Sequence, residues 1–322
     1  MKRQRHLLML FRFLKYVQPT HYFALLQNDG TSVFPDVSKL SPAEIALLEE
    51  DSLYVSEQAS AYDLSWQAVL KGYIGEVTTY KGDSKLPIVD EYRFLRKNFH
   101  PIWTLYVLLL RLGSFKNPIT EIQGFLKTRN VSRKIYTTTP FQYPKWNQQT
   151  CKLLDDKPLV SVVIPTLNRY RYLEQVLHDF EKQTYTTFEI IVVDQSQPFQ
   201  ERFYEQFNLQ IKVVRQEEPA LWLARNTAVQ ESKGAIIALS EDDVRIPEDW
   251  LENHLRCLHF FNASISAGVF FPEGGSIPQN RSFFAIAPQF ATGNAMLYKN
   301  VFKKVGMFDR QFEKQRMGDG EF

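Results

Sequence analysis

The stretch LVSVVIP, residues 159 to 165, is a nearly continuous run of apolar and β-branched residues. Such a run predicts a strand that is buried on both faces of a sheet. The residues after it place apolar side chains at helical spacing, namely Leu173, Val176, Leu177 and Phe180. They predict an amphipathic helix. A buried strand followed by a helix is the opening unit of an α/β fold.

The same alternation continues along the chain. Further strands are expected at FEIIVVD (188–194), IKVVRQ (211–216) and AIIALS (235–240), with helices near 199–207 and 220–232. Buried strands separated by helices predict a mostly parallel sheet flanked by helices, and ligands bind such sheets beyond the carboxyl ends of the strands. Polar residues follow three of these ends: PTLNR, Asp194 and the acidic run EDD. We therefore expect a binding site at this edge.

The acidic run Glu241, Asp242 and Asp243 follows the last of these strands directly. Like charges this close repel unless they are solvated, share protons or hold a cation. Carboxylate oxygens suit Mg²⁺ or Mn²⁺, which leave positions open for phosphate oxygens. The sequence contains neither GxGxxG nor GxxxxGK[ST], so a bound phosphate needs another counter-charge. The alternative is that one or more of these acids, Asp242 above all, caps the following helix.

Composition narrows the classes of function. The length of 322 residues favours about two domains. The hydrophobic content of 44% is enough to build substantial cores. Its 38 Lys and Arg against 36 Asp and Glu give a formal charge of +2, so the overall charge offers no argument for binding nucleic acid. Cys151 and Cys257 lie in different regions, which argues against a disulfide framework and favours a reducing, cytoplasmic compartment.

The N-terminal part, residues 1–136, is expected to be a partly helical accessory region of unknown role. Its clearest element is a helix near LSPAEIALLEED, where Ser41 caps, Pro42 fits the first turn and Glu44 completes a capping box. Turns are expected at 28–30 and 81–83. Residues 137–158 are polar, contain three prolines and predict a linker.

Two segments bear on membranes. The longest apolar run, IWTLYVLLL at 102–110, is well short of the roughly 20 residues that a membrane-spanning helix needs. The N-terminus, MKRQRHLLMLFRFLKYV, mixes basic and apolar residues and lacks a signal-peptide cleavage site. It is either a basic amphipathic helix, peripheral at the inner face of the membrane, or an ordinary helix docked on its own domain.

Four motifs occur in the order that a known family shows. They are VSVVIPTLNRYRYLEQVLHDFEKQTYTTFEIIVVD, ALWLARNTAVQESKGAIIALSEDD, FATGNAMLYKNVFKKVGMFDRQF and GDGEF. With these motifs, residues 159–322 resemble a family 2 glycosyltransferase of the Rossmann-like GT-A fold. That family consists of inverting enzymes that use nucleotide-activated sugar donors. The resemblance implies a nucleotide-sugar donor, a divalent cation (Mg²⁺ or Mn²⁺), and a saccharide or lipid-linked acceptor.

The resemblance also assigns site residues on the donor side. It implies that the loop beneath the nucleotide contains Pro165, Thr166 and Asn168. Asp194 would contact the nucleobase, because a carboxylate accepts hydrogen bonds from base N–H groups, and Arg225 would lie near the base or the diphosphate. The alternative for Arg225 is that it is a solvated charge on a helix, with no role in the site. Asp243 is the expected metal ligand, with Glu241 at acid-x-acid spacing and Asp242 beside them.

On the acceptor side, the resemblance implies that Asp319 of GDGEF is the catalytic base. It would deprotonate the acceptor hydroxyl as that oxygen attacks the anomeric carbon. The alternative for Asp319 is a turn residue between glycines. Glu321 would position this loop or the acceptor, and the acceptor-side segment contributes Gly293 and Asn294.

The sequence departs from the family pattern at three places. Gln195 stands where a second acid is common, Glu241 takes the place of an aspartate, and the chain ends at Phe322, where a GT-A domain normally continues. The resemblance thus implies a C-terminally truncated domain. The expected function is inverting glycosyl transfer in surface polysaccharide or glycolipid synthesis. The alternative is a catalytically lapsed GT-A domain that binds nucleotide or acts as a scaffold. A metal-dependent phosphohydrolase has less support, because the acidic run lacks a partner histidine.

Overall fold

The structure, a computed structural model, describes residues 32–80, 86–114, 116–287 and 290–313. The chain divides into two compact units at Gln142 and Tyr143, and Pro278–Pro288 belongs to the first unit. The domain boundaries expected from sequence, 1–136, 137–158 and 159–322, stay predictions. Outside the described residues lie the N-terminal segment 1–17, the turns at 28–30 and 81–83, and the two candidates Asp319 and Glu321.

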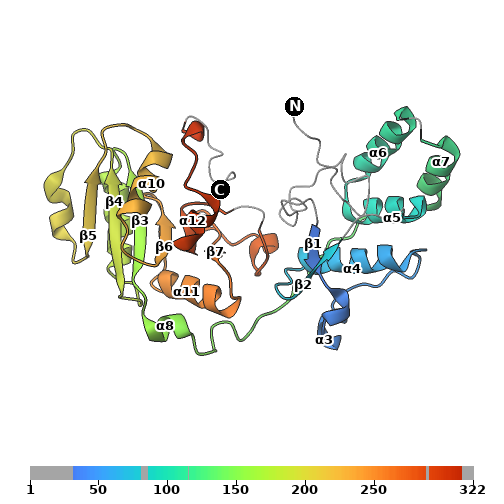
Figure 1. Cartoon of the computed structure of the whole chain (residues 1–322), viewed down its shortest axis with the longest axis horizontal. Helices are drawn as coiled ribbons and strands as arrows, with labels where there is room; N and C mark the ends of the chain where they lie inside the picture. Colours follow the sequence, from blue (N-terminus) through green and yellow to red (C-terminus); the bar gives the residue numbers. More distant parts are fainter. Residues whose placement is uncertain (1–31, 81–85, 115, 288–289, 314–322) are drawn as a thin grey trace. The chain divides into compact units, whose positions relative to one another are not determined.

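The second unit is built on a six-stranded sheet in the order β5-β4-β3-β6-β8-β7 (Figure 1). Its strands are β3 (Val160–Thr166), β4 (Phe188–Asp194), β5 (Ile211–Arg215), β6 (Ile236–Ser240), β7 (Ile265–Ala267) and β8 (Asn294–Tyr298). The first four pair in parallel, whereas β8 pairs antiparallel to both β6 and β7. The expected α/β class with a mostly parallel sheet is therefore confirmed.

Helices cover both faces of this sheet. Helices α9 (Tyr170–Phe180) and α11 (Trp250–Phe260) pack on one face with the side chains of Val162 and Ile164. The opposite face, with Val163, is covered by α10 (Leu221–Glu231) and α12 (Asn300–Val305). Alternate strand residues thus face alternate layers, which is why these strands are apolar throughout.

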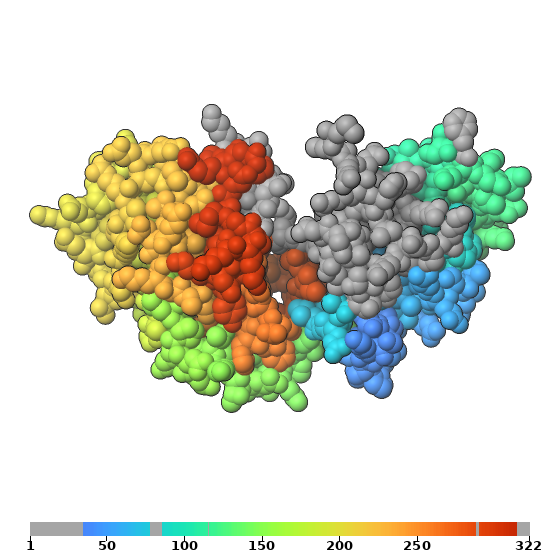
Figure 2. Space-filling view, viewed as in Figure 1, coloured from blue at the N-terminus to red at the C-terminus, as the bar shows by residue number. Residues whose placement is uncertain are grey.

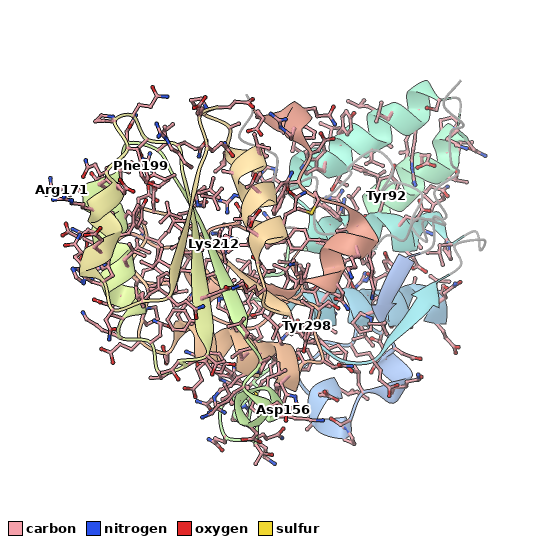
Figure 3. The ribbon with its side chains drawn as sticks, turned by 60° about the vertical axis from the view of Figure 1, so that its left-hand side comes forward. Tyr92, Asp156, Arg171, Phe199, Lys212 and Tyr298 are labelled. Carbon is pink, nitrogen blue, oxygen red and sulfur yellow. The ribbon has the colours of Figure 1, made fainter. Side chains whose placement is uncertain are left out.

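Shorter elements complete the second unit. They are α8 (Lys152–Asp156) and the 3₁₀ segments η2 (Glu201–Gln206) and η4 (Arg310–Phe312). The 3₁₀ segment η3 (Gln279–Arg281) belongs to the first unit. The helix expected near 199–207 is the 3₁₀ segment η2, whose Tyr204 hydroxyl is hydrogen-bonded to Asp194. Figure 3 labels Lys212 on the edge strand β5, Tyr298 on β8 and the exposed Arg171 on α9.

The first unit is mainly helical. Its elements are β1 (Ser32–Pro35), η1 (Val37–Lys39), α3 (Pro42–Ile45), α4 (Glu57–Leu70), β2 (Val77–Tyr80), α5 (Ile88–Asn98), α6 (Pro101–Gly113) and α7 (Pro118–Lys127), with β1 and β2 antiparallel. An aromatic core joins α4 to α5 through Tyr62, Trp66 and Phe94. The expected capping box is present, because the Ser41 and Glu44 side chains each accept from the other's backbone N–H.

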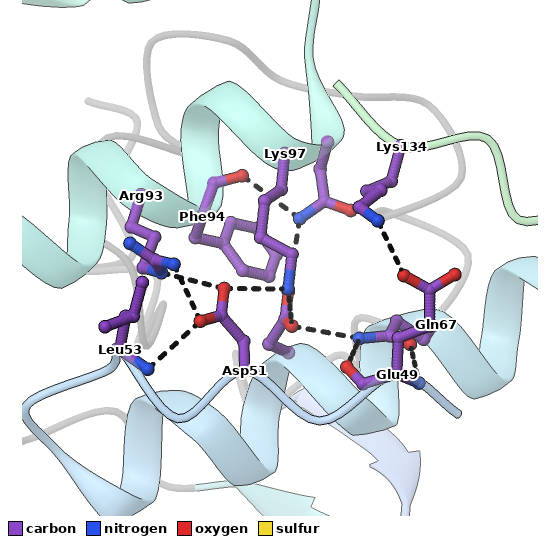
Figure 4. Close-up of polar contacts among 10 residues, drawn as sticks. Glu49, Asp51, Leu53, Gln67, Arg93, Phe94, Lys97 and Lys134 are labelled. Carbon is purple, nitrogen blue, oxygen red and sulfur yellow. Dashed lines mark hydrogen bonds and ion pairs between the residues drawn. The ribbon is translucent and has the colours of Figure 1, made fainter. Parts of the chain in front are cut away.

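A polar network fixes α5 against α4 and the preceding loop (Figure 4). Asp51 accepts two hydrogen bonds from Arg93, both at 2.7 Å. The buried Lys97 ammonium lies 2.5 Å from Asp63 and 3.3 Å from Asp51. Because a buried charge is stabilised only when it is paired and hydrogen-bonded, this network explains how α5 tolerates a buried lysine.

Candidate functional site

The carboxyl ends of three strands bring the predicted site residues together. Strand β3 lies between β4 and β6, and Thr166 at its end pairs in register with Asp194 at the end of β4. On the other side, the Thr166 hydroxyl donates a hydrogen bond of 2.8 Å to Asp242, which follows β6. The end of β3 therefore lies beside the end of β4 and is hydrogen-bonded to the acidic run that follows β6.

The acidic run carries its own counter-ion. Asp243 is exposed, whereas Asp242 is buried. A single nitrogen of Arg169, Nη1, lies 2.6 Å from an Asp243 oxygen and 3.4 Å from an Asp242 oxygen. Burial raises the pKa of Asp242, against the effect of Thr166 and Arg169, and the carboxylate of Asp242 is the main reason that the pKa of Arg169 is raised. Two of the three acids therefore share one positive charge.

Glu241 is paired separately. Its carboxylate accepts a hydrogen bond from Arg225 of α10, whose guanidinium is completely buried and also donates to the Thr292 carbonyl at 3.0 Å. Burial raises the pKa of Glu241, and Arg225 acts in the opposite direction. Among the described residues, the Nε atom of Arg225 has no hydrogen-bond partner. Arg225 is therefore a buried partner of the acidic run and not a solvated helix charge.

Gly293 lies against this pair from the acceptor-side segment. A Cβ atom at this position would lie 2.3 Å from Cγ of Glu241 and 3.0 Å from the ring of Phe270. No side chain fits that gap without movement of its neighbours. Glycine is thus required here because the backbone before β8 passes directly over Glu241.

Asp194 is fully buried and its carboxylate is occupied. It accepts hydrogen bonds from the hydroxyls of Tyr170 and Tyr204, both at 2.7 Å, and from the N–H of Ser196 at 2.8 Å. Burial is the main cause of the raised pKa of both tyrosines, and the bond to Asp194 adds to it. Because Asp194 is fully buried beneath these groups, a nucleobase can reach it only if one of them, such as a tyrosine side chain, moves.

The loop after β3 is tied to the loop after β4. Asn168 has a φ of 57°, in the left-handed region that asparagine tolerates. Its N–H donates to Ser196 Oγ at 2.8 Å, and its side-chain oxygen accepts from the N–H of Gln197 at 2.9 Å. Pro165 lies within β3 and is buried. The predicted nucleotide loop after β3 is therefore held in place by its hydrogen bonds to the loop after β4.

Gln195, which departs from the family pattern, has a structural use. Its buried side-chain oxygen accepts from the Ala220 N–H at 2.7 Å and from the Gln216 amide at 3.1 Å. An acceptor is thus needed at the start of α10, and an uncharged amide provides it without burying a further carboxylate.

The acceptor-side candidate Asn294 faces helix α11. Its side-chain oxygen accepts from Trp250 Nε1 at 2.9 Å and lies 3.1 Å from His254 Nε2. The other ring nitrogen of His254, Nδ1, lies 2.9 Å from the Ser266 hydroxyl. A neutral His254 that donates from Nε2 to Asn294 therefore accepts at Nδ1 from Ser266. Burial lowers the pKa of His254 to about 4. Asn294 therefore anchors β8 to α11.

The donor chemistry at Asp242 and Asp243 fits a divalent cation. Among the described residues, no group of three or more acidic, histidine or cysteine side chains is arranged to hold a metal ion. However, these two carboxylates already stabilise one shared positive charge, and the Arg169 side chain that supplies it is half-exposed. Carboxylates together with phosphate oxygens are the ligands that Mg²⁺ commonly takes. Glu241 is held by Arg225 instead.

Three residues of this site were not predicted from sequence. Arg169 is adjacent to the predicted Asn168, and its positive charge near an acidic run was an available signal. Tyr170 and Tyr204 contact Asp194 only through the fold, since one begins α9 and the other lies in η2. No pattern along the chain marks that pairing.

Comparison with known proteins identifies the segment that carries this site. Residues 161–309 match the family model described as glycosyl transferase family 2. These residues form a family 2 glycosyltransferase segment. The family 2 segment includes all the described site residues above, and it confirms the resemblance drawn from the four motifs.

Three curated relatives of the family 2 segment are named as glycosyltransferases. Glycosyltransferase AglE of Haloferax volcanii is 29% identical over 165 residues, which are 48% of this chain and 53% of the relative. Glycosyltransferase GlyA of Streptococcus pneumoniae is 28% identical, with 51% of this chain and 23% of the relative covered. The putative teichuronic acid biosynthesis glycosyltransferase TuaG of Bacillus subtilis is 34% identical, with 31% and 41% covered. The chain thus spans about half, or less, of the length of these relatives.

Solved structures with partial similarity are also glycosyltransferases. The mannosyltransferase PcManGT from Pyrobaculum calidifontis, in complex with GDP-Man and Mn²⁺, is 21% identical with a TM-score of 0.42, covering 55% of each chain. TarS of Staphylococcus aureus is 19% identical with a TM-score of 0.41, covering 50% of this chain and 52% of its own.

Proposed function

We propose that this protein is an inverting glycosyltransferase that moves a sugar from a nucleotide-diphosphate sugar to an acceptor hydroxyl. The observation that carries the proposal is the convergence of Thr166, Asp194 and Asp242 at one sheet edge within the family 2 segment. The names of relatives such as TuaG support a role in the synthesis of a surface polysaccharide. A glycolipid is the other class of product that fits the proposal.

The donor would bind beyond the ends of β3, β4 and β6. Asp243 and Asp242 would hold a Mg²⁺ or Mn²⁺ ion, which when bound neutralises the charge that develops on the leaving diphosphate. Arg169 would leave these two carboxylates and pair with the diphosphate, because its guanidinium is half-exposed and forms strong bidentate bonds with phosphate. Asn168 would support the nucleotide from below, and Asp194 would accept from the base after a tyrosine hydroxyl is released.

The acceptor would lie on the side of Gly293. Asp319 is the proposed base, on the strength of its place in the ordered motifs, and would remove the proton of the attacking hydroxyl. Holding donor and acceptor together would supply much of the remaining rate enhancement. Glu321 would orient the loop that carries Asp319.

A donor screen tests the proposal. Saturation-transfer NMR of the full chain against nucleotide-diphosphate sugars, with Mg²⁺ as a diamagnetic cation, should identify at least one bound donor. Asp243→Ala should weaken that binding about tenfold or more. Asp249→Ala is the matched control, because Asp249 is an exposed acid in the same loop whose side chain caps no helix N–H.

A second measurement separates catalysis from binding alone. With a bound donor and a panel of saccharide and lipid-linked acceptors, mass spectrometry should detect transfer that Asp319→Asn abolishes while donor binding persists. Donor binding without any transfer would favour the alternative of a nucleotide-binding or scaffold module. Absence of nucleotide binding with and without the cation would refute both.

A further inference from the structure

Helix α6 of the first unit exposes an apolar face to solvent. Its two side chains that are polar or charged, Thr104 and Arg111, are both buried. Its exposed face consists of apolar and aromatic side chains: Ile102, Trp103, Leu105, Tyr106 and Leu109. Ordinary surface helices show the opposite arrangement, with polar residues toward water. The exposed face of α6 is therefore built to contact something other than water.

The neighbouring helix α7 extends this surface. It packs against α6 and α5, and it exposes Ile119, Ile122 and Leu126 at spacings of three and four residues along one side. Figures 1 and 2 show α6 and α7 side by side at the surface of the first unit, in green. On α6, the rings of Trp103 and Tyr106 form an edge-to-face pair with centroids 5.5 Å apart. We call these eight apolar residues of α6 and α7 the apolar face.

In the stretch of sequence that carries the apolar face, the exposed charges have one sign. Between Phe99 and Ile135 the sequence contains one acid, Glu121, and the structure buries it against Arg111 and Tyr92. Four exposed bases in the same stretch form no ion pair with any described residue: Lys116, Lys127, Arg129 and Arg133. Arginine, lysine, tryptophan and tyrosine beside exposed leucine and isoleucine are the composition of a surface that lies at a membrane interface.

We propose that the apolar face binds the surface of a bilayer that contains anionic lipids. The helices would lie in the plane of the interface, with leucine and isoleucine at the acyl boundary, the two aromatic rings at headgroup depth and the four bases against lipid phosphates. The 13 residues of α6 are too few to cross the bilayer. Among the described residues, no helix is long and apolar enough to do so.

Charge argues against other occupants of the apolar face. A second copy that docked face to face would bring a second set of four bases close to the first, and like charges oppose that approach. Residues 1–17 carry five bases and no acid, so they would also meet like charge there. An anionic lipid surface complements the bases and the apolar side chains together.

Vesicle co-sedimentation of the full chain tests the proposal. Binding should be strong to phosphatidylcholine vesicles that contain phosphatidylglycerol and weak to phosphatidylcholine alone. Leu105→Ser/Leu109→Ser should weaken binding about tenfold or more. Leu53→Ser/Val55→Ser, two apolar residues outside α6 and α7 that are more exposed than Leu105 and Leu109, should leave it unchanged.

A second pair of variants tests the contribution of the four bases to vesicle binding. Lys127→Gln/Arg129→Gln should weaken binding by about fivefold for each base removed, since a base near an anionic surface contributes about that much. Lys303→Gln/Lys304→Gln, two exposed bases of the second unit, should change binding much less. Equal losses in both pairs would mean that only net charge matters, and would overturn the proposal.

Fluorescence locates the contact without a change of charge. Anionic vesicles should shift the emission of the native chain to shorter wavelength, and Trp103→Phe should remove most of that shift while vesicles are still bound. An unchanged shift would overturn the proposal. So would a Leu105→Ser/Leu109→Ser chain that binds vesicles normally but changes its oligomeric state in sedimentation velocity, because that result identifies a protein partner.

Discussion

The buried guanidinium of Arg225 donates a hydrogen bond to the carboxylate of Glu241, the first acid after β6. The family resemblance gives these two residues separate tasks, one at the nucleotide and one at the metal. In the structure they form one pair that links α10 to the acidic run. Either task therefore depends on the partner's position as well as on the residue itself.

Breaking this pair should destabilise the second unit. Glu241→Ala leaves the Arg225 charge buried without its carboxylate, and we expect a loss of about 3 kcal/mol in the free energy of unfolding. Urea unfolding followed by tryptophan fluorescence measures the loss. The exposed pair Lys212–Glu231 is the control, and Glu231→Ala should cost much less, because an exposed ion pair contributes little to stability. Equal effects of the two substitutions would contradict the structural role of Arg225.

Arg169 should compete with a metal ion for Asp242 and Asp243. Removing its guanidinium in Arg169→Ala frees both carboxylates, so the affinity for Mn²⁺ without nucleotide should rise a few-fold, or by about 1 kcal/mol. Electron paramagnetic resonance titration of free Mn²⁺ measures this directly. Arg171→Ala, a change at an exposed arginine two residues further on, should leave the affinity unchanged. Weaker Mn²⁺ binding in Arg169→Ala would show that the arginine orients the acids for the ion.

His254 should make the second unit sensitive to acid. Its pKa in the folded protein, about 4, lies below the value of about 6.5 of an unfolded chain. The folded state therefore binds fewer protons, and the stability present above about pH 6.5 is lost as the pH falls toward 4. The contribution is about 3 kcal/mol at most.

Replacing the imidazole tests this dependence. His254→Gln retains a donor toward Asn294 and does not titrate, so its free energy of unfolding should change less than that of the native chain between pH 7 and pH 4.5. His259→Gln alters an exposed histidine of the same helix and should retain the native dependence. A native pH dependence in His254→Gln would assign the acid sensitivity to other groups.

Much of the sheet was predictable, because its strands are buried on both faces. The runs around Val162, Ile191 and Ile237 consist almost entirely of apolar residues, and each strand is found within a residue of its expected range. The capping box at Ser41 was predictable for a different reason, since its partners are three residues apart. Both signals are local, and the structure confirms both.

The remaining features depend on contacts between distant residues. Tyr204 reaches Asp194 only after β4 and η2 have folded, and Arg225 reaches Glu241 across the packing of α10 on the sheet. The apolar run at 102–110 shows in sequence only that it is too short to span a membrane, whereas the structure shows that it exposes one of its faces. Periodicity does not reveal this, because α6 is apolar on nearly every side.

The antiparallel strand β8 has a consequence for how such a site can diversify. The N–H of Gly268, just after β7, donates to the carbonyl of Asn294 at the start of β8, at 2.8 Å. The intervening chain is therefore a loop whose two ends are fastened together beside the acidic run. Doubling the length of such a loop costs only about 0.6 kcal/mol in closure entropy. Added residues between these two ends would therefore cost little closure entropy, and the register of β6 against β8, which sets the position of the acidic run, would stay the same.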